Sequence, residues 1–204
     1  MSAKAPKRPY QMRRRAEAQA RTRLRITESA VELHGTLGPA RTSISAIASH
    51  ARVRRATVYR HFPDEAALFA ACSARWLEVN PLPDLSSSPQ VRDPQLRLRC
   101  ALLELYGFYR SKAQMIDNLL RDEPALPVLT PHLDGYRNYL QAARETLLRG
   151  RRLHHAARRR TSAAIGHALA FATWRSLAVE QQLSDSEAAE LMCGLVAAAT
   201  RPLR

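Results

Sequence analysis

Eight consecutive residues, 54–61, carry a dense set of side chains that can bind nucleic acid. Guanidinium, hydroxyl and imidazole groups donate hydrogen bonds to phosphate oxygens, and a guanidinium fork also matches the O6/N7 edge of guanine. Val58 is the residue of this stretch expected to point inward, so the pattern is too polar for a core helix. It indicates a short helix that contacts DNA, through Arg54, Arg55, Thr57, Tyr59, Arg60 and His61.

The flanking residues predict the elements that would position this helix. Ser43 is the expected N-cap of a short preceding helix, and Asp64 is the expected N-cap of a longer following one. An earlier helix is expected to begin at Thr22 and to end at Gly35 and Gly38. Short helices joined by tight turns in this order indicate a helix-turn-helix.

The rest of the chain also predicts helices. Asp93-Pro94 and Thr130-Pro131 combine a cap with a proline at the first helical position, and Ser184 with Glu187 forms a capping box. We therefore expect helices over 94–110, 114–121, 130–148, 161–182 as one long helix, and 185–200. The fold class is all-α, with an N-terminal three-helix head that contains the helix-turn-helix and a larger helical body.

Composition shifts suggest three regions. Residues 1–21 form a basic arm, which we expect to be helical from about Met12; residues 22–79 form the DNA-binding head, and residues 80–204 form the body. The stretch 80–94 is rich in Pro and Ser and is the expected linker between head and body.

The net charge of +14 is concentrated in two blocks. Residues 1–25 hold nine Lys or Arg and one acid, and residues 149–160 hold six Arg and no acid. Residues 26–78 hold six basic and five acidic residues, so the head is nearly neutral. The short polar helix expected over 54–61 is the reading helix. Each of its cations must act individually, because no general basic coat surrounds it.

Several classes of function are not indicated. Three distant cysteines form no CxxC pair, which favours a reducing cytoplasm and neither a disulfide framework nor a zinc module. No signal peptide and no membrane span are expected, because no apolar run is long enough. No nucleophile–base pair, metal cluster or Gly-rich phosphate loop is visible, so we expect neither an enzyme nor a cofactor.

The head resembles the TetR family of transcriptional regulators. The family motif has a Thr/Ser start, an Ile-Ala pair, a Gly-Val turn, and then Thr-x-Tyr-x-His-Phe and Lys. The matching residues are Thr42, Ser43, Ile47, Ala48, Val53, Thr57, Tyr59, His61 and Phe62. Three positions depart from the motif: Arg52 replaces the turn glycine, Arg54 replaces the Ser cap, and Glu65 replaces a phosphate-binding Lys.

The resemblance implies a ligand-responsive regulator, and a repressor is expected. It would bind a palindromic DNA operator as a homodimer through the last two helices, 161–182 and 185–200, and a small-molecule effector would release it. The expected DNA contacts combine the reading helix with Thr42 and Ser43 at a helix start and with the arm residues Arg13, Arg14 and Arg15. The alternative is a nonspecific, architectural DNA-binding protein that uses the same basic residues.

Effector-binding residues are harder to identify. Aromatic residues of the body could line an apolar pocket, but aromatic residues at helical spacing are more often plain core, and core is the favoured interpretation for each one taken singly. The expected set is Tyr106, Tyr109, Tyr136, His167, Phe171 and Trp174, with Phe108, Met115 and Tyr139 nearby in sequence. His167 and Trp174, seven residues apart on one face of an expected helix, are the pair of greatest interest.

The arginine-rich stretch 149–160 allows two interpretations. It is either a solvated connection between helices or a contact for DNA or an acidic ligand. His154 and His155 do not suggest a metal site, because neighbouring helical residues diverge and no acid or Cys lies near them in sequence.

Overall fold

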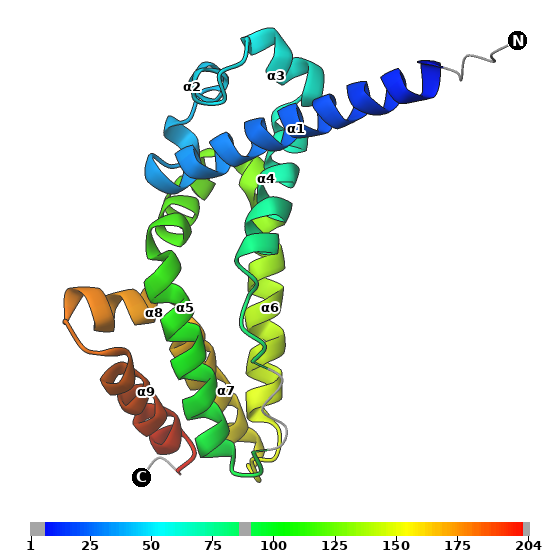
Figure 1. Ribbon diagram of the computed structural model, residues 1–204. Coiled ribbons are helices and arrows are strands. Elements are labelled where there is room, and N and C mark those ends of the chain that lie inside the picture. The colour runs from blue at the N-terminus through cyan, green and yellow to red at the C-terminus, as the bar shows by residue number, and fades with distance from the viewer. Residues whose placement is uncertain (1–6, 86–90, 202–204) are drawn as a thin grey trace, which may run out of the picture. The chain divides into compact units, whose positions relative to one another are not determined.

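A computed structural model describes residues 7–85 and 91–201, and every regular element within these ranges is a helix. The expected all-α fold class is therefore confirmed (Figure 1). Residues 1–6 of the expected arm and residues 86–90 of the expected linker lie outside the described residues. The chain divides into two compact units, and each is described by itself.

The first unit contains the helix-turn-helix head and comprises the chain up to Pro81 together with Asp117–Thr130. Its hydrophobic core collects apolar side chains from all four head helices, including Ile26, Ile47, Val58 and Leu68. The head helices are α1 (Lys7–Thr36), α2 (Ile44–His50), α3 (Arg55–His61) and α4 (Glu65–Val79), with the short 3-10 helix η1 (Pro39–Arg41) between α1 and α2.

The expected arm and the first head helix are a single helix, α1, of 30 residues. It begins at Lys7, earlier than the expected start at about Met12. Pro9 lies in the first turn, where a missing N–H costs nothing, and no Gly or Pro separates the arm from Thr22. Figure 1 shows the N-terminal turns of α1 extending beyond the other head helices.

The second unit comprises Leu82–Ile116 and Pro131–Arg204. The helix α5 (Pro94–Asp122) contributes residues to both units, because the division falls within it. The other helices are α6 (Thr130–Leu148), α7 (His155–Leu169), α8 (Phe171–Trp174), a π-helix (Arg175–Glu180) and α9 (Asp185–Ala199).

Two expected boundaries in this part of the chain are wrong. The helices expected over 94–110 and 114–121 are one continuous helix, since the intervening Ser111-Lys112-Ala113 contains no Gly or Pro. The single helix expected over 161–182 begins instead at His155 and is interrupted at Ala170, whose backbone is extended.

The interruption at Ala170 has a cause in the tertiary structure. Two carbonyls at the end of α7 accept hydrogen bonds from tyrosine hydroxyls of α5: Ala168 from Tyr106 at 2.8 Å and Leu169 from Tyr109 at 2.7 Å. These partners satisfy carbonyls that a broken helix would otherwise leave unpaired. Periodicity along one helix carries no information about hydroxyls on another, so the sequence alone did not predict the break.

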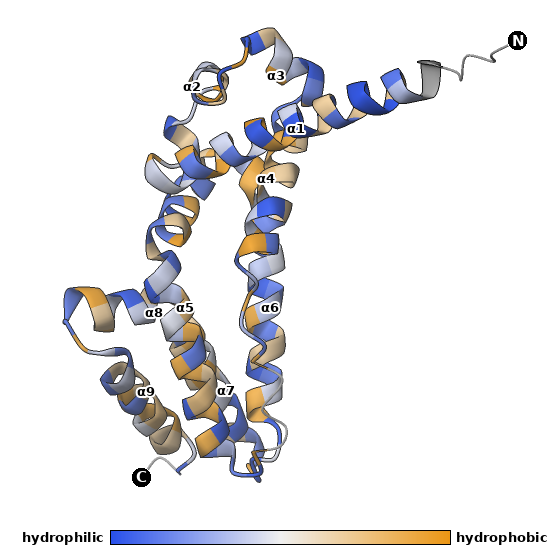
Figure 2. Cartoon of the chain, viewed as in Figure 1, coloured by the Kyte–Doolittle hydropathy of each residue, from blue (hydrophilic) through white to orange (hydrophobic). Residues whose placement is uncertain are grey.

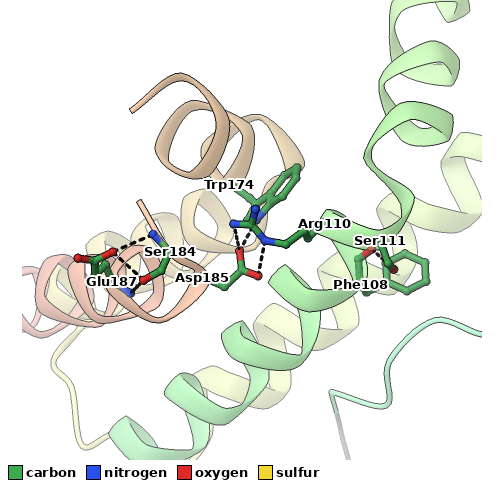
Figure 3. A network of polar contacts seen from close by, with 7 residues as sticks. All are labelled: Phe108, Arg110, Ser111, Trp174, Ser184, Asp185 and Glu187. Carbon is green, nitrogen blue, oxygen red and sulfur yellow. Dashed lines mark hydrogen bonds and ion pairs between the residues drawn. The ribbon is translucent and has the colours of Figure 1, made fainter. Parts of the chain in front are cut away.

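The expected helix caps at Ser43, Asp64 and Ser184 are present, whereas Thr130, which was also expected to be a cap, is the first residue of α6 and has helical backbone angles. The Ser43 hydroxyl accepts from the Ala46 N–H at 3.1 Å, and the Asp64 carboxylate accepts from the Ala67 N–H at 2.7 Å. Ser184 and Glu187 form the full capping box at the start of α9 (Figure 3). Local signals of this kind were sufficient to place the helix starts that position the reading helix.

Candidate nucleic-acid interface

The reading helix α3 presents its polar side chains to solvent. Val58 is fully buried in the head core and anchors the helix, while Arg54, Arg55, Tyr59 and Arg60 are exposed. Thr57 and His61 are partly buried. Tyr59 keeps 45% of its surface exposed, which is high for a large aromatic residue and leaves its ring available to a partner.

A hollow of about 450 Å³ in the head gathers expected DNA-binding residues from separate elements. The N-terminal end of α2 contributes Thr42 and Ser43, and α3 contributes Arg55 and Tyr59. These side chains offer hydroxyl and guanidinium donors around one space, which is the chemistry that a phosphate group requires. Sequence spacing suggested each residue separately; the structure brings these four together.

Glu65 lines the same hollow. It is the first residue of α4 and stands at the position where the family motif has a Lys. A carboxylate beside a phosphate is repulsive, so this residue weakens the electrostatic fit of the hollow to DNA. The departure seen in the sequence therefore falls directly within the candidate interface.

Arg55 and Tyr59 form a pair along one face of α3. Arg55 Nη2 donates to the Tyr59 hydroxyl at 3.0 Å, and the guanidinium carbon lies 5.5 Å from the centre of the Tyr59 ring. The spacing of four residues places the two side chains on the same helix face. The pair restrains the guanidinium while leaving further N–H groups free to donate.

The two departures in the turn have direct structural consequences. Arg52 adopts a φ of +51°, the left-handed conformation that the family glycine adopts without strain. Arg54 occupies the N-cap of α3 and makes no side-chain cap hydrogen bond. The turn therefore keeps its shape, while the start of α3 lacks the usual cap and gains an exposed cation.

Arg23 of α1 contacts the end of the reading helix, a role that was not predicted from the sequence. Its Nη1 donates to the His61 carbonyl, and its guanidinium lies 4.1 Å from the centre of the Phe62 ring. A cation at a helix C-terminus interacts favourably with the helix dipole. Arg23 is 38 residues from His61 in sequence, so local patterns could not reveal the contact.

The same contact affects His61. Partial burial lowers the pKa of His61 below 6.5, and the neighbouring cations Arg60 and Arg23 lower the pKa further. The neutral imidazole is therefore favoured near neutral pH, and it can both donate and accept a hydrogen bond.

The arm residues are exposed along the free turns of α1. Arg13 forms an i,i+4 ion pair with Glu17 at 3.0 Å, and Arg14 lies over the Tyr10 ring at 5.7 Å. Arg15 is exposed as well. Figure 2 shows how hydrophilic these turns are. Arg13, Arg14 and Arg15 are thus presented on a helix.

The turn between α1 and α2 is braced from the end of α5. Asn118 donates to the carbonyls of His34 and Gly35, and the Asp122 carboxylate accepts from the Ala40 N–H at 3.0 Å. Although burial opposes its ionisation, hydrogen bonds from Arg121 and Ala40 hold the pKa of Asp122 below its usual value. Gly38, at a φ of +94°, has no room for a Cβ, which would lie 2.6 Å from Asp122 Oδ2.

Most effector-binding residues expected in the body are buried or half-buried, and they contact one another through their rings and through one hydroxyl–hydroxyl hydrogen bond. Tyr136 donates to the Tyr109 hydroxyl at 2.6 Å, since Tyr109 gives its own proton to Leu169. Burial raises the pKa of Tyr136 to about 12 and that of Tyr109 further still. Phe171 meets Tyr109 edge-on at 5.3 Å. These residues form a compact aromatic cluster around the break at Ala170.

Trp174 joins this cluster to a salt bridge that sequence analysis did not find. Its indole N–H donates to Asp185 at 2.9 Å, and Arg110 donates two hydrogen bonds to the same carboxylate at 2.8 and 2.9 Å (Figure 3). The hydrogen bonds from Arg110 are the main cause of the lowered pKa of Asp185. The contact ties the start of α9 to α5 and α8.

His167 lies apart from Trp174. The break at Ala170 separates the two residues, and His167 is exposed whereas Trp174 is almost fully buried. The expectation that they share one helix face is therefore wrong. The His167 ring makes a long contact to the Thr173 hydroxyl, at 3.3 Å.

Other kinds of site are not found in the part of the chain that the structure describes. No group of three or more His, Cys, Asp or Glu side chains there could hold a metal ion. Within residues 7–85 and 91–201, no helix is both long enough and apolar enough to span a membrane.

The fold and this interface define a helix-turn-helix protein of the DNA-binding class. Residues 26–72 match the family model of the bacterial regulatory proteins, tetR family. The matched stretch runs from Ile26 in α1 to Cys72 in α4, so it contains the reading helix and every residue that lines the hollow except Leu126. The TetR resemblance inferred from the sequence is thereby confirmed, and it covers the helix-turn-helix of the head.

Solved structures share the fold over most of the chain. A TetR-like transcriptional regulator from Rhodococcus sp. RHA1 is 21% identical, with a TM-score of 0.63 over 86% of this chain and 93% of that one. A putative fatty acid metabolism regulator from Clostridium perfringens is 15% identical, with a TM-score of 0.60 over 85% and 97%. The multidrug binding protein EbrR, complexed with imidazole, is 20% identical, with a TM-score of 0.52 over 85% and 93%. The comparison with curated proteins finds no match.

Proposed function

We propose that this chain is a transcriptional repressor that binds a palindromic DNA operator as a homodimer and is released by a small-molecule effector. The observation that carries the proposal is the hollow in the head. Thr42, Ser43, Arg55 and Tyr59 come from two helices and converge there, within the segment that matches the family model. Convergent donors of this kind fit the phosphate backbone beside a reading helix.

The exposed side chains of α3 supply the sequence readout. Arg55 and Arg60 project from the reading helix and are suited to the O6/N7 edge of guanine. Thr57 can contact a thymine methyl group or a phosphate, and Arg54 adds a cation at the helix start. Arg13, Arg14 and Arg15 on the free turns of α1 follow the backbone or enter a minor groove.

A homodimer would form through residues 161–182, which span most of α7 together with α8 and the π-helix, and through α9. On α9, an exposed stripe with the spacing i, i+3, i+4, i+7 consists of Leu191, Gly194, Leu195 and Ala198. Leu191 and Leu195 are 51% and 44% exposed, and a Cβ at Gly194 would meet nothing within 4 Å in this chain. An apolar stripe with a small residue at its centre suits close packing against a second helix pair.

The stripe makes the dimer testable by sedimentation of the full chain. Leu191→Glu should shift the protein from dimer to monomer, because it places a charge in an apolar contact. Leu96→Glu is the matched control, since Leu96 is also exposed, at 48%, and lies outside the last two helices. A Leu191→Glu variant that stays dimeric would contradict this interface.

The effector would bind in the body, and the aromatic cluster around Tyr109, Tyr136, Phe171 and Trp174 is the proposed region. EbrR, which shares the fold, is described as a multidrug binding protein and was solved with imidazole. A largely apolar cluster with a few hydroxyl groups suits a hydrophobic or weakly polar molecule. Its binding would favour a conformation of the dimer that no longer fits both half-sites, and so release DNA.

Selection of bound sites from random duplex DNA tests the proposal directly. We expect a palindrome with half-sites about one helical turn (~34 Å) or its multiple apart, and a protected footprint on it. Arg55→Ala should relax the base preference at one position in each half-site, whereas Arg14→Ala should weaken all sequences alike. Recovery of no common sequence would overturn the specific regulator.

The helical basic arm supports a second candidate function, a nonspecific architectural DNA-binding protein. Exposed arginines on a helix bind any duplex through its phosphates. Competition with unrelated DNA separates the two functions. A specific regulator should keep a preference of roughly 10³-fold or more for its site, and an architectural protein should show almost none.

A further inference from the structure

The connection between α6 and α7 contains the half-buried Arg151 and the exposed Arg149 and Arg152 in a stretch without acids. Arg97 of α5, which packs against this connection, is only 8% exposed. Its Nη1 donates to the Val91 carbonyl at 3.2 Å and its Nη2 donates to the Arg149 carbonyl, while Nε is buried and has no hydrogen-bond partner. A guanidinium that is more than nine-tenths buried is normally paired with a carboxylate.

A second cation lies beside Arg97. Arg151 is half-buried and donates to the carbonyls of Pro94 and Leu147 and to the side chain of Gln95. Burial lowers the pKa of Arg151, and the charge of Arg97 lowers the pKa further. Backbone carbonyls orient both guanidinium groups but carry no net charge, so the repulsion between the two cations is only partly offset.

The surrounding backbone favours an anion as well. The two arginines lie at the first turn of α5, a 29-residue helix with no acidic residue in that turn. Peptide dipoles make a helix N-terminus attractive to anions. Gly150, at a φ of +78°, brings the connection close, since a Cβ there would lie 3.6 Å from Arg97 Nη2.

Asp93, the carboxylate that lies near Arg151, already caps the start of α5. Asp93 lies near enough to favour the charged form of Arg151, but its carboxylate accepts from the Gln95 N–H at 2.9 Å as a cap. In the described ranges, neither Arg97 nor Arg151 forms a salt bridge. One carboxylate that caps a helix therefore faces two desolvated guanidinium groups.

We propose that Arg97, Arg151 and the first turn of α5 form a binding site for a phosphate-type oxyanion, flanked by the exposed Arg149 and Arg152. The tetrahedral anion would accept hydrogen bonds from the guanidinium N–H groups that carbonyls leave unused. The anion would come from a free phosphate or phosphorylated small molecule, or from the backbone of DNA. The site is separate from the reading helix and from the aromatic cluster, and it does not depend on the proposed function.

Thermal unfolding of the full chain tests the site. Inorganic phosphate should raise the midpoint temperature in a saturable way relative to sodium chloride at equal ionic strength. Arg151→Gln should weaken phosphate binding at least tenfold, and Arg97→Lys should weaken it less than Arg97→Met does. Arg137→Gln removes the same charge from an exposed position on α6 and should leave phosphate binding unchanged.

A second measurement distinguishes the two sources of phosphate. If DNA supplies it, the Arg149→Gln/Arg152→Gln double variant should bind unrelated duplex DNA more weakly and with a salt slope smaller by about 2. If a small molecule supplies it, the affinity for DNA should not change while phosphate stabilisation is lost. If phosphate and chloride stabilise equally and the double variant binds DNA normally, the arginines only cap the end of α6 and the site does not exist.

Discussion

The reading helix and the aromatic cluster use similar residues in opposite ways. In the head, Arg55 and Tyr59 point to solvent and line a hollow, and their hydrogen bond to each other leaves donors unused. In the body, Tyr106 and Tyr109 are fully buried, and their hydroxyls are occupied by the carbonyls at the end of α7. The comparison shows that a polar aromatic residue on a helix predicts a site only when nothing else in the fold uses its hydroxyl group.

The test with the largest expected effect removes one hydroxyl group from the buried aromatic cluster. Tyr109→Phe should destabilise the protein by roughly 1–3 kcal/mol, because it leaves the Leu169 carbonyl and the Tyr136 hydroxyl without their partner in a buried place. Urea unfolding measures the loss. Tyr59→Phe is the matched control on the reading helix and should change stability little, since Tyr59 is exposed. Equal losses of stability in the two variants would contradict the difference between the two regions.

The head also contains a buried polar residue, His34, which is only 4% exposed. Burial lowers the pKa of His34 from 6.5 to about 4, and the ring stacks on Phe69 at 4.9 Å. Because the unfolded chain binds a proton at His34 at a higher pH than the folded chain does, protonation of His34 favours unfolding. The stability of the fold is therefore unaffected by His34 above about pH 6.5 and falls as the pH is lowered towards 4. We expect a loss of about 2 kcal/mol between about pH 7.5 and about pH 4.5.

The contribution of His34 is isolated by substitution. His34→Gln should remove that part of the pH dependence in urea unfolding curves, whereas His155→Gln, at an exposed position, should leave the curve unchanged. An unaltered pH profile in His34→Gln would show that the acid sensitivity comes from other groups.

The role of the hollow in the head can be tested by reversing the charge at Glu65, which lines it. Glu65→Lys should tighten binding to DNA by roughly fivefold to tenfold, or about 1 kcal/mol, and should increase the salt slope by about 1. The physical reason is that a cation replaces a carboxylate in the hollow that Thr42 and Tyr59 also line. Glu78→Lys makes the same charge change in the last turn of α4 and is the control; equal gains in both variants would mean that only net charge matters.

The smallest expected effect concerns the turn that presents α3. Arg52→Gly should be more stable than Arg52→Ala by about 1 kcal/mol, because only glycine adopts a φ of +51° without strain. Thermal or urea unfolding of the two variants measures the difference. If Ala is as stable as Gly, the backbone relaxes in the Ala variant and the turn carries no strain.

The parts of the molecule that sequence analysis predicted well depend on neighbouring residues. The caps at Ser43, Asp64 and Ser184 are local signals, and so is the motif that places Thr57 and Tyr59 on one short helix. The same locality explains the errors. The break at Ala170 depends on hydroxyl groups that lie about 60 residues earlier in the chain, and no proline or glycine marks it.

In the candidate site, too, the local features could be predicted from the sequence and the tertiary ones could not. Exposure of the α3 side chains could be anticipated from the lack of apolar residues, but the hollow could not, because it needs α2, α3 and α4 in place together. The contact of Arg23 with His61 was also out of reach, since no pattern links two residues that far apart. Tertiary partners, in both regions, decide whether a predicted residue is available.

The continuity of α1 has a consequence for the entropy of binding. A disordered arm loses about 1–2 kcal/mol of conformational free energy for each residue that a partner orders. From Lys7 onward the arm is already helical, because the part of α1 that packs in the core supplies the nucleus that an isolated helix lacks. Arg13, Arg14 and Arg15 would therefore meet a polyanion without a folding step, and their attraction would appear almost entirely as affinity.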